Sequence, residues 1–220
     1  MTRAMTWTLG PAPDVRAVAG VLARLQPDLV LLADLPTGLG AMRRLTSGTD
    51  LRIASRAGKG RAGSAVLVGP DVRVRSEATL ELAGAGTPRS AAHAIVGAGG
   101  RTLSVLAFRL GADPEGRLSD AATIQTFLER VDQVDVLGGD LGEGASGPAA
   151  KLLLHDRVDV WTVGGNGPGD TYPTPEPTAR HDVLIVDAGI AVGRAHVLDD
   201  SDADRAARHR PVVADLEDLQ

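Results

Sequence analysis

The sequence of 220 residues contains no cysteine, which excludes disulfide bonds and thiolate metal sites and leaves the redox compartment open. Aromatic residues make up only 2% of the chain, so the core must be built from Val, Leu, Ala and Ile. No apolar run approaches the roughly 20 residues that a membrane-spanning helix needs, and the N-terminus shows no charged-then-apolar signal pattern. From these absences we expect a cytoplasmic protein with no membrane contact.

Positive charge is carried almost entirely by arginine, because Lys59 and Lys151 are the only lysines. The net charge is −5, and the sequence contains no basic block. The aromatic residues that could stack on a nucleobase are Trp7, Phe108, Phe127, Trp161 and Tyr172. A dedicated nucleic-acid binder needs a positive face and usually stacking platforms, so we expect no dedicated nucleic-acid surface. The composition still allows an enzyme that meets a phosphate group at one local site.

Short apolar runs bounded by Gly, Pro or Asp predict a chain rich in strands. We expect strands at 4–9, 28–35, 51–56, 64–69, 72–82, 91–98, 102–110, 134–140, 158–163, 182–188, 190–198 and 211–217. Apolar spacing predicts helices at 14–26, 119–131 and 147–156. The Gly-containing segments 96–103 and 186–192 are typical of hairpin turns. Together these patterns predict a single α+β domain over residues 1–220, with a β-sandwich at its centre.

One segment predicts an aspartate at the end of a core strand. In VDVLGGDLGE, residues 134–143, an apolar run ends in Gly-Gly-Asp, which places Asp140 at the point where the strand would stop. Taken singly, Asp140 and Asp34 could each cap a turn, and His209 could be a surface histidine beside two arginines. Single titratable residues are weak evidence for a site, so the order of the segments matters more than any one of them.

Several motifs follow one another in an order that is informative. GDLG resembles Gly-Asp-Phe-Asn, and RHRPVVADL resembles Ser-Asp-His-Arg-Pro-Val. Between them, TYPTPEPTARHDVLIV (171–186) resembles a segment that begins Thr-Phe-Pro and, after a further proline, ends Arg-Ile-Asp-Tyr-Ile. Upstream, TWTL, PDLVLLADL, GSAVLV and AFRL match the strand ends that precede these motifs. The whole series resembles the endonuclease/exonuclease/phosphatase superfamily, which has the fold of pancreatic deoxyribonuclease. The resemblance spans nearly the whole chain and implies a four-layer αββα sandwich, in which two packed mixed β-sheets are flanked by helices.

The resemblance also implies a site for metal-dependent phosphoester hydrolysis, with Mg²⁺ or Mn²⁺ as cofactor if the protein is active and none otherwise. Carried over by position, the catalytic residues are Asp140, His209 and Asp182, the phosphate-binding residues are Arg109 and Arg180, and the metal ligands are Asp34 and Thr8. These types suit the chemistry, since Mg²⁺ prefers hard oxygen ligands and a base needs an accessible pKa.

Four positions depart from the family's pattern. Asp34 stands in place of a glutamate, so its carboxylate stops about 1.5 Å short, and Thr8 stands in place of an asparagine. Gly142 replaces another asparagine and contributes no side chain. Arg109 replaces a histidine; it cannot donate a proton at neutral pH, but it can bind a phosphate through two N–H groups.

A fifth departure concerns the surroundings of His209. Arg208 precedes it where the family has an aspartate, and a cation there would oppose protonation of the imidazole. Asp202 or Asp204 could supply the missing carboxylate if the loop before the last strand folds back. Without that rescue, the resemblance implies a largely dismantled site.

Two functions are left open by these residues. The first is a pseudoenzyme that hydrolyses phosphoesters weakly or not at all, and keeps an anion-binding cleft for a phosphate or a phosphate-containing small molecule, or serves a protein partner. The second is an active divalent-metal phosphodiesterase or phosphatase that acts on a small phosphoester through altered ligands. Alternatively, Arg109 and Arg208 form ordinary ion pairs with neighbouring aspartates and the cleft is filled, or the chain is an unrelated α/β protein.

Overall fold

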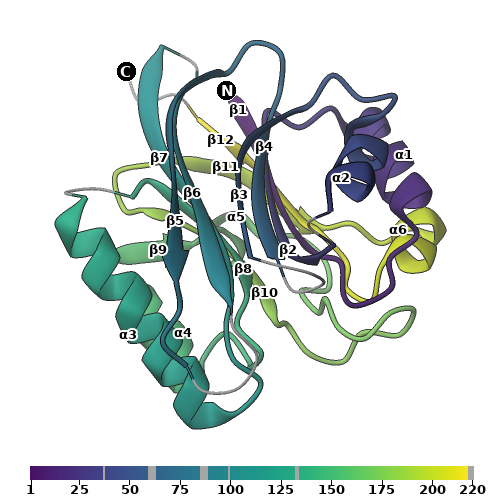
Figure 1. Cartoon of the computed structure of the whole chain (residues 1–220). Coiled ribbons are helices and arrows are strands. Elements are labelled where there is room, and N and C mark those ends of the chain that lie inside the picture. Colours follow the sequence, from purple (N-terminus) through teal and green to yellow (C-terminus); the bar gives the residue numbers. More distant parts are fainter. Residues whose placement is uncertain (37, 59–62, 85–88, 99, 132–133, 218–220) are drawn as a thin grey trace.

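The computed structural model describes the whole chain except residues 37, 59–62, 85–88, 99, 132–133 and 218–220. Its described part contains two six-stranded sheets packed face to face, with helices on their outer faces (Figure 1). This is the α+β, four-layer αββα sandwich that the resemblance implies, so the predicted fold class is confirmed. None of the helices in the described residues is long and apolar enough to cross a membrane.

The first sheet carries the N-terminal strand in its middle. Its strands in spatial order are β11 (Val192–Val197), β12 (Val212–Leu216), β1 (Thr2–Thr8), β2 (Leu29–Leu35), β4 (Gly63–Val68) and β3 (Arg52–Ala57). β1 and β2 are parallel, and the other pairs are antiparallel. The outer face is covered by α1 (Val15–Leu25), α2 (Leu39–Thr46) and α6 (Ser201–Ala206) (Figure 1).

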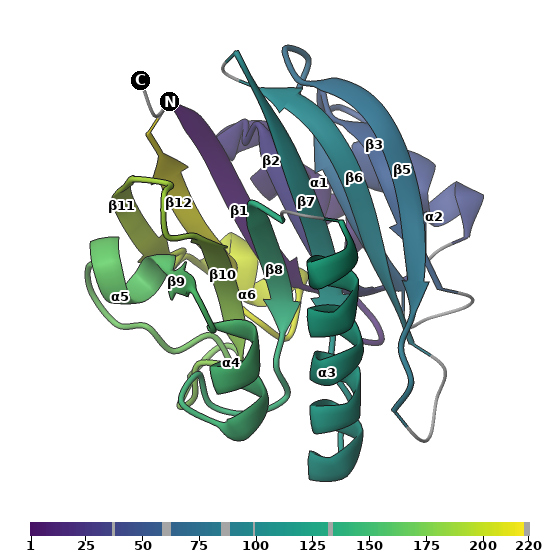
Figure 2. The ribbon, with the colours of Figure 1, turned by 90° about the vertical axis from the view of Figure 1, so that its left-hand side faces the viewer.

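The second sheet is built the same way around another parallel pair. Its strands in spatial order are β5 (Arg73–Glu81), β6 (Ser90–Ala98), β7 (Arg101–Arg109), β8 (Val136–Asp140), β10 (Asp182–Asp187) and β9 (Arg157–Asp159). Only β7 and β8 pair in parallel. α3 (Pro114–Arg130) and α4 (Pro148–Leu153) pack on its outer face, and the short α5 (Val160–Gly164) follows β9 (Figure 2).

Small and branched apolar side chains fill the space between the two sheets. This core includes Leu31, Val66, Ala94, Val105 and Val136, all fully buried. Trp7 packs in the layer under α1 and Phe108 in the layer under α3, whereas the partly buried Trp161 packs against the inter-sheet core. The composition-based prediction of a core made from Val, Leu, Ala and Ile is therefore confirmed for the inter-sheet layer.

The three predicted helices are present, and their first residues show why they begin where they do. α1 begins after Asp14, whose carboxylate accepts hydrogen bonds from the backbone N–H groups of Arg16 and Ala17. α3 begins five residues before the predicted start at Ser119, because Asp113 caps the backbone N–H of Gly116 and proline occupies the first turn. The helices α2, α5 and α6 were not predicted from the sequence.

Two local predictions are wrong. Residues 158–163 are not one strand, because β9 ends at Asp159, whose carboxylate accepts from the backbone N–H of Trp161 and starts α5. Segment 186–192 is not a hairpin turn, because β10 and β11 belong to different sheets. The other predicted hairpin is confirmed, since Ala98 of β6 lies opposite Arg101 of β7.

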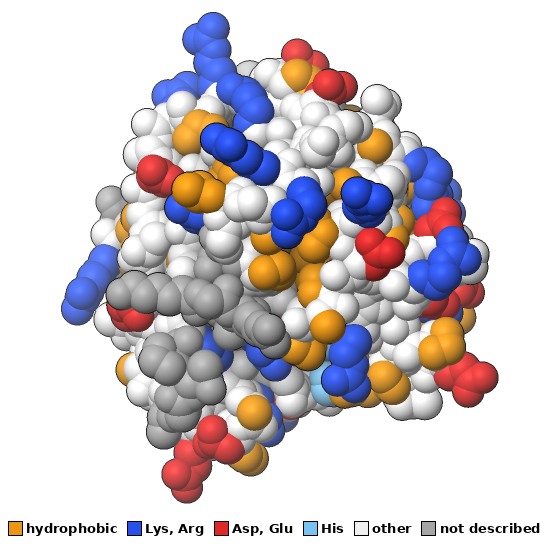
Figure 3. All heavy atoms as spheres, turned by 45° about the vertical axis from the view of Figure 1, so that its right-hand side comes forward, with side chains coloured by type: hydrophobic (Ala, Val, Ile, Leu, Met, Phe, Trp, Pro, Cys, Tyr) orange, Lys and Arg blue, Asp and Glu red, His pale blue; other side chains and the backbone are white. Residues whose placement is uncertain are grey.

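Charged side chains are mixed on the surface that can be followed in Figure 3. On that face, Lys and Arg side chains are spread among apolar and acidic ones. The absence of a dedicated nucleic-acid surface concerns the whole molecule and stays a prediction.

The glycine pair in VDVLGGDLGE is required by close packing inside β8. A Cβ on Gly139 would lie 1.9 Å from the carbonyl oxygen of Phe108 on the neighbouring strand, and one on Gly138 would lie 2.9 Å from the Cβ of Thr6 in the other sheet. No side chain fits at such distances without backbone movement. The two glycines therefore let β8 approach both neighbours and deliver Asp140 at its end.

We expect Gly139→Ala to lower the free energy of unfolding by about 3 kcal/mol or more, because the clash is with backbone. The matched control is Gly144→Ala, since a Cβ on Gly144 meets nothing within 4 Å; its effect should stay below about 0.5 kcal/mol. Urea unfolding of both variants measures the difference. Equal midpoints would show that the close approach of β7 and β8 does not require glycine.

Candidate functional site

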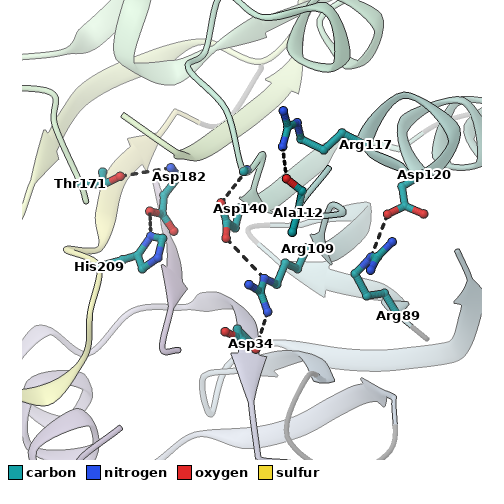
Figure 4. Close-up of polar contacts among 11 residues, drawn as sticks. Asp34, Arg89, Arg109, Ala112, Arg117, Asp120, Asp140, Thr171, Asp182 and His209 are labelled. Carbon is teal, nitrogen blue, oxygen red and sulfur yellow. Dashed lines mark hydrogen bonds and ion pairs between the residues drawn. The ribbon is translucent and has the colours of Figure 1, made fainter. Parts of the chain in front are cut away.

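The ends of five strands bring the expected residues to one end of the sandwich. β1 and β2 run parallel, so Thr8 and Asp34 reach the same end of the first sheet. β7 and β8 also run parallel, and Arg109 lies opposite Asp140 at their carboxyl ends. β10 runs the other way and begins with Asp182, directly opposite Asp140. Figure 4 shows Asp34, Arg109, Asp140 and Asp182 of this group at the same end of the two sheets.

The guanidinium of Arg109 joins two of the carboxylates. Its Nη1 lies 2.7 Å from Oδ1 of Asp34, and its Nε lies 3.5 Å from Oδ2 of Asp140. Figure 4 shows the guanidinium between the two aspartates, one from each sheet. The Arg109 side chain is 35% exposed, whereas those of Asp34 and Asp140 are 8% and 6% exposed. The ion pairs expected as one alternative are therefore present at Arg109, which covers two buried carboxylates.

An irregularity in β2 positions Asp34. The register with β4 shifts between Ala33 and Leu35, and Asp34 between them has a positive φ of 50°. Such a bulge changes the direction of one side chain relative to its neighbours, and aspartate is among the residues that tolerate the left-handed conformation. The bulge places the Asp34 carboxylate at Arg109.

A second buried pair lies beside this cluster. Nδ1 of His209 lies 2.7 Å from Oδ2 of Asp182, and the two residues are 6% and 0% exposed. The indole N–H of Trp7 donates to the carbonyl oxygen of His209 at 2.7 Å, which fixes this backbone to β1. The Tyr172 ring packs against the imidazole with its centre 4.6 Å away. His209 is therefore held by a carboxylate, a backbone hydrogen bond and a ring.

This pair corrects the expectation for the surroundings of His209. Its carboxylate partner is Asp182, not Asp202 or Asp204, because Asp202 forms an ion pair with Arg205 and Asp204 one with Arg210. Arg208 packs over the Tyr172 ring, with its guanidinium carbon 5.7 Å from the ring centre. Its expected opposition to the protonation of His209 stays a prediction.

The buried charges change one another's ionisation. Burial disfavours the imidazolium of His209, but the charge and hydrogen bond of Asp182, with the charge of Asp140, outweigh burial and raise its pKa. Burial raises the pKa of Asp140, and the negative charge of Asp182 raises it further. Burial also raises the pKa of Asp34, although Arg109 and His209 act in the opposite direction. His209 therefore keeps its positive charge to a higher pH than an ordinary histidine.

Two residues that the motifs single out make contacts that were not expected. Two other residues contact the Asp182–His209 pair and were not predicted. Arg180 forms an ion pair with Asp159 at the end of β9, so its guanidinium is engaged outside the Arg109 cluster. Gly142 donates its backbone N–H to Oδ1 of Asp140 at 2.7 Å and thereby orients that carboxylate. Among the missed residues, Thr171 accepts from the backbone N–H of Asp182 at 3.1 Å. Tyr172 follows it, so the Thr-Tyr-Pro segment carried the signal for both residues.

The donor set does not fit a divalent cation as the chain stands. Within the described residues, no three His, Asp or Glu side chains are grouped so as to hold a metal. Asp34 and Asp140 both contact the Arg109 guanidinium, whose positive charge would repel a second cation at the same place. The hydroxyl of Thr8 and Oδ1 of Asp182 are buried and accept no hydrogen bond from any described residue. These oxygens suit Mg²⁺ by type, but the cation position between the two bridged carboxylates is filled by arginine.

We predict that Asp182→Asn lowers the pKa of His209 below its wild-type value. Burial, which disfavours the imidazolium, would then act without the carboxylate that opposes it. Titration of the imidazole by NMR measures the shift, and Asp204→Asn, which affects the ion pair with Arg210, is the control. A wild-type His209 pKa in Asp182→Asn would contradict the assignment of Asp182 as its electrostatic partner.

Comparisons with known proteins agree with this architecture. No protein-family model matches the sequence, and no curated protein is significantly similar to it. Solved structures do match over nearly their whole length. A conserved protein of unknown function from Enterococcus faecalis V583 has a TM-score of 0.88 at 18% identity, covering 98% of this chain and 99% of that one.

Two further structures carry informative names. A mannosyl-6-phosphatase from Bacteroides thetaiotaomicron VPI-5482 has a TM-score of 0.87 at 13% identity, covering 99% of this chain and 100% of its own. An endonuclease/exonuclease/phosphatase family protein from Bacteroides thetaiotaomicron has a TM-score of 0.86 at 14% identity, covering 99% and 98%. At these identities the likeness concerns the fold. The chain therefore has the fold of the endonuclease/exonuclease/phosphatase superfamily, as its motifs indicate.

Proposed function

We propose that this protein binds the phosphate group of a small phosphoester without a divalent metal, and hydrolyses it weakly or not at all. The observation that carries the proposal is the Arg109 guanidinium, which bridges Asp34 and Asp140 and leaves part of its surface exposed. The fold alone does not decide the activity, because one fold hosts many functions. The activity therefore depends on the groups at the strand ends.

Two positively charged side chains supply hydrogen-bond donors for the phosphate. Nη1 and Nε of Arg109 contact carboxylates, and 35% of its side chain stays exposed. His209 uses Nδ1 for Asp182, and its Nε2 has no partner among the described residues. A phosphate needs charge-assisted donors of this kind, and Arg109 is the most exposed charged group of the cluster. The buried carboxylates lie behind the donors and hold them in place.

One structure with this fold supports a small ligand. The mannosyl-6-phosphatase with the same fold is named for a sugar phosphate, and by analogy a phosphorylated metabolite is the ligand class that we propose here. Catalysis would require a group that activates water and a cation that stabilises the phosphoryl oxygens. The Asp182–His209 pair retains the first requirement in type, whereas the carboxylates for the second are occupied by Arg109.

Sulfate is the sharpest first probe, because its charge does not change between weakly acidic and weakly basic pH. We expect calorimetry in the presence of EDTA to detect sulfate binding, and Arg109→Gln to weaken it about tenfold by removing one charge-assisted contact. The control Arg205→Gln changes an exposed arginine that pairs with Asp202 and should bind like the wild type. Equal affinities for all three proteins would refute a role for Arg109.

The same titration has a defined pH dependence. The His209 pKa is raised in the folded protein, so the imidazolium is fully present below the ordinary histidine pKa and is lost as pH rises through the raised value. Sulfate affinity should therefore fall as pH rises through that range. A flat profile would exclude the imidazolium from the binding site.

The second candidate is an active phosphoesterase, which the intact Asp182–His209 pair favours. Asp140→Asn separates the two functions, because asparagine still accepts the hydrogen bond from Gly142 but removes a buried negative charge. In the binding protein, the variant should bind sulfate several-fold more tightly, since a repulsive charge is lost. In an active enzyme, it should abolish Mg²⁺- or Mn²⁺-dependent turnover of an activated phosphodiester or phosphomonoester. Metal-dependent turnover that vanishes in Asp140→Asn would establish the second function.

A further inference from the structure

The strand ends that carry Arg109 and its partners hold several buried oxygen atoms. The carboxylates of Asp34 and Asp140 contact it directly, at 2.7 and 3.5 Å. Asp182 lies opposite Asp140 in the register of β8 and β10, and its Oδ1 has no hydrogen-bond partner among the described residues. The hydroxyl of Thr8, which is fully buried at the end of β1, is equally without a partner there. The strand ends therefore supply more oxygen atoms than one guanidinium satisfies.

We propose that Arg109 is a tethered cation that blocks a dormant divalent-cation site, and that removing its side chain opens this site to Mn²⁺ or Mg²⁺. The site would be formed by the carboxylates of Asp34 and Asp140, which Arg109 bridges in the wild type. The inference shares Arg109 with the proposed function, which makes this guanidinium a contact for phosphate. It adds that the same residues bind a divalent cation once Arg109 is removed, which the wild-type protein does not do.

Burying an ionised carboxylate costs free energy unless a partner charge lies beside it. Asp34 and Asp140 are only 8% and 6% exposed in their side chains, and ionised groups at such positions need a partner charge. In the wild type, Arg109 is that partner for both. Without it, the two buried carboxylates lose the positive charge that they contact, and another cation can take its place. A divalent ion has oxygen preferences that this cluster meets by type.

The attachment of Arg109 explains why the wild type excludes a metal. Its guanidinium is covalently held at the carboxyl end of β7, next to Asp140 on β8. It therefore competes with a dissolved metal ion for the two carboxylates at a high effective concentration. The contact with Asp34 also crosses from one sheet to the other (Figure 4). A free ion would have to displace this bridge before it reached either carboxylate. The same bridge predicts that a lysine, which retains the charge, continues to exclude the ion.

The test compares Mn²⁺ binding by the whole protein in four forms. Arg109→Ala opens the most space, and Arg109→Gln retains more of the side-chain volume in case the alanine variant does not fold. Arg109→Lys keeps the positive charge, and Arg109→Gln with Asp34→Asn removes one proposed ligand. Calorimetry and the electron paramagnetic resonance of Mn²⁺ measure binding, and thermal unfolding with and without Mn²⁺ measures linked stabilisation.

We expect Arg109→Gln, and Arg109→Ala if it folds, to bind Mn²⁺ at least about tenfold more tightly than the wild type and to show a rise in Tm with Mn²⁺. Arg109→Lys and the Asp34→Asn double variant should behave like the wild type. Arg205→Gln, which removes an exposed arginine elsewhere, should also show no gain. A folded Arg109→Gln that binds Mn²⁺ no better than the wild type would overturn the proposal, and so would tight binding by the wild type.

These outcomes are separate from those of the proposed function. Sulfate binding is measured on the wild type in EDTA, whereas metal binding is measured on variants that lack Arg109. If sulfate does not bind but Arg109→Gln gains Mn²⁺, the cation site stands and the phosphate function fails. If sulfate binds through Arg109 but no variant gains Mn²⁺, the phosphate function stands and the dormant site is wrong.

Discussion

The need to balance buried negative charge governs this end of the molecule. Parallel pairing of β1 with β2 and of β7 with β8 directs side chains from both sheets to one end of the sandwich. Three of those side chains, Asp34, Asp140 and Asp182, are buried carboxylates. Isolated ionised carboxylates are costly in such surroundings, so the cations that accompany them determine what the site can bind. In this chain the partners of these carboxylates are Arg109 and His209, whose raised pKa favours the imidazolium.

Arg109 and His209 contact different carboxylates. Arg109 bridges Asp34 and Asp140 across the two sheets, whereas His209 pairs with Asp182. Breaking a buried pair by removing one partner is costly because it leaves an unpaired charge, even where the intact pair adds little net stability. Each cation is therefore needed where it stands. The proposed anion site uses the same two side chains, of which Arg109 is partly exposed.

Motif order was sufficient to predict the fold, because the strand ends and turns of the superfamily are recognisable even where site residues differ. Local detail was harder to predict. VDVWTV is rich in β-branched residues, but the capping carboxylate of Asp159 turns its second half into α5. The turn at 186–192 is real as a change of direction, yet no local pattern shows that β10 and β11 belong to different sheets.

The sequence predicted which residues lie together at the strand ends, but not which of them contact one another. Asp140, Asp182 and His209 could be named from their motifs, whereas the partner of His209 lies 27 residues away and its chain neighbour Arg208 faces Tyr172. Adjacency in sequence was misleading because successive side chains do not face the same way. Likewise, Arg109 was a candidate for both phosphate binding and ion pairing. The bulge at Asp34, which decides how that carboxylate meets Arg109, has no clear sequence signal.

The most direct test of the central claim is a crystal structure of the wild-type protein soaked with Mn²⁺ and phosphate, with data collected at the manganese absorption edge. We expect Arg109 to lie between Asp34 and Asp140, with phosphate density at its guanidinium and at Nε2 of His209. No anomalous peak should appear at the two aspartates. An anomalous peak on Asp34, with Arg109 displaced, would contradict the claim and would show that the wild-type site takes a metal.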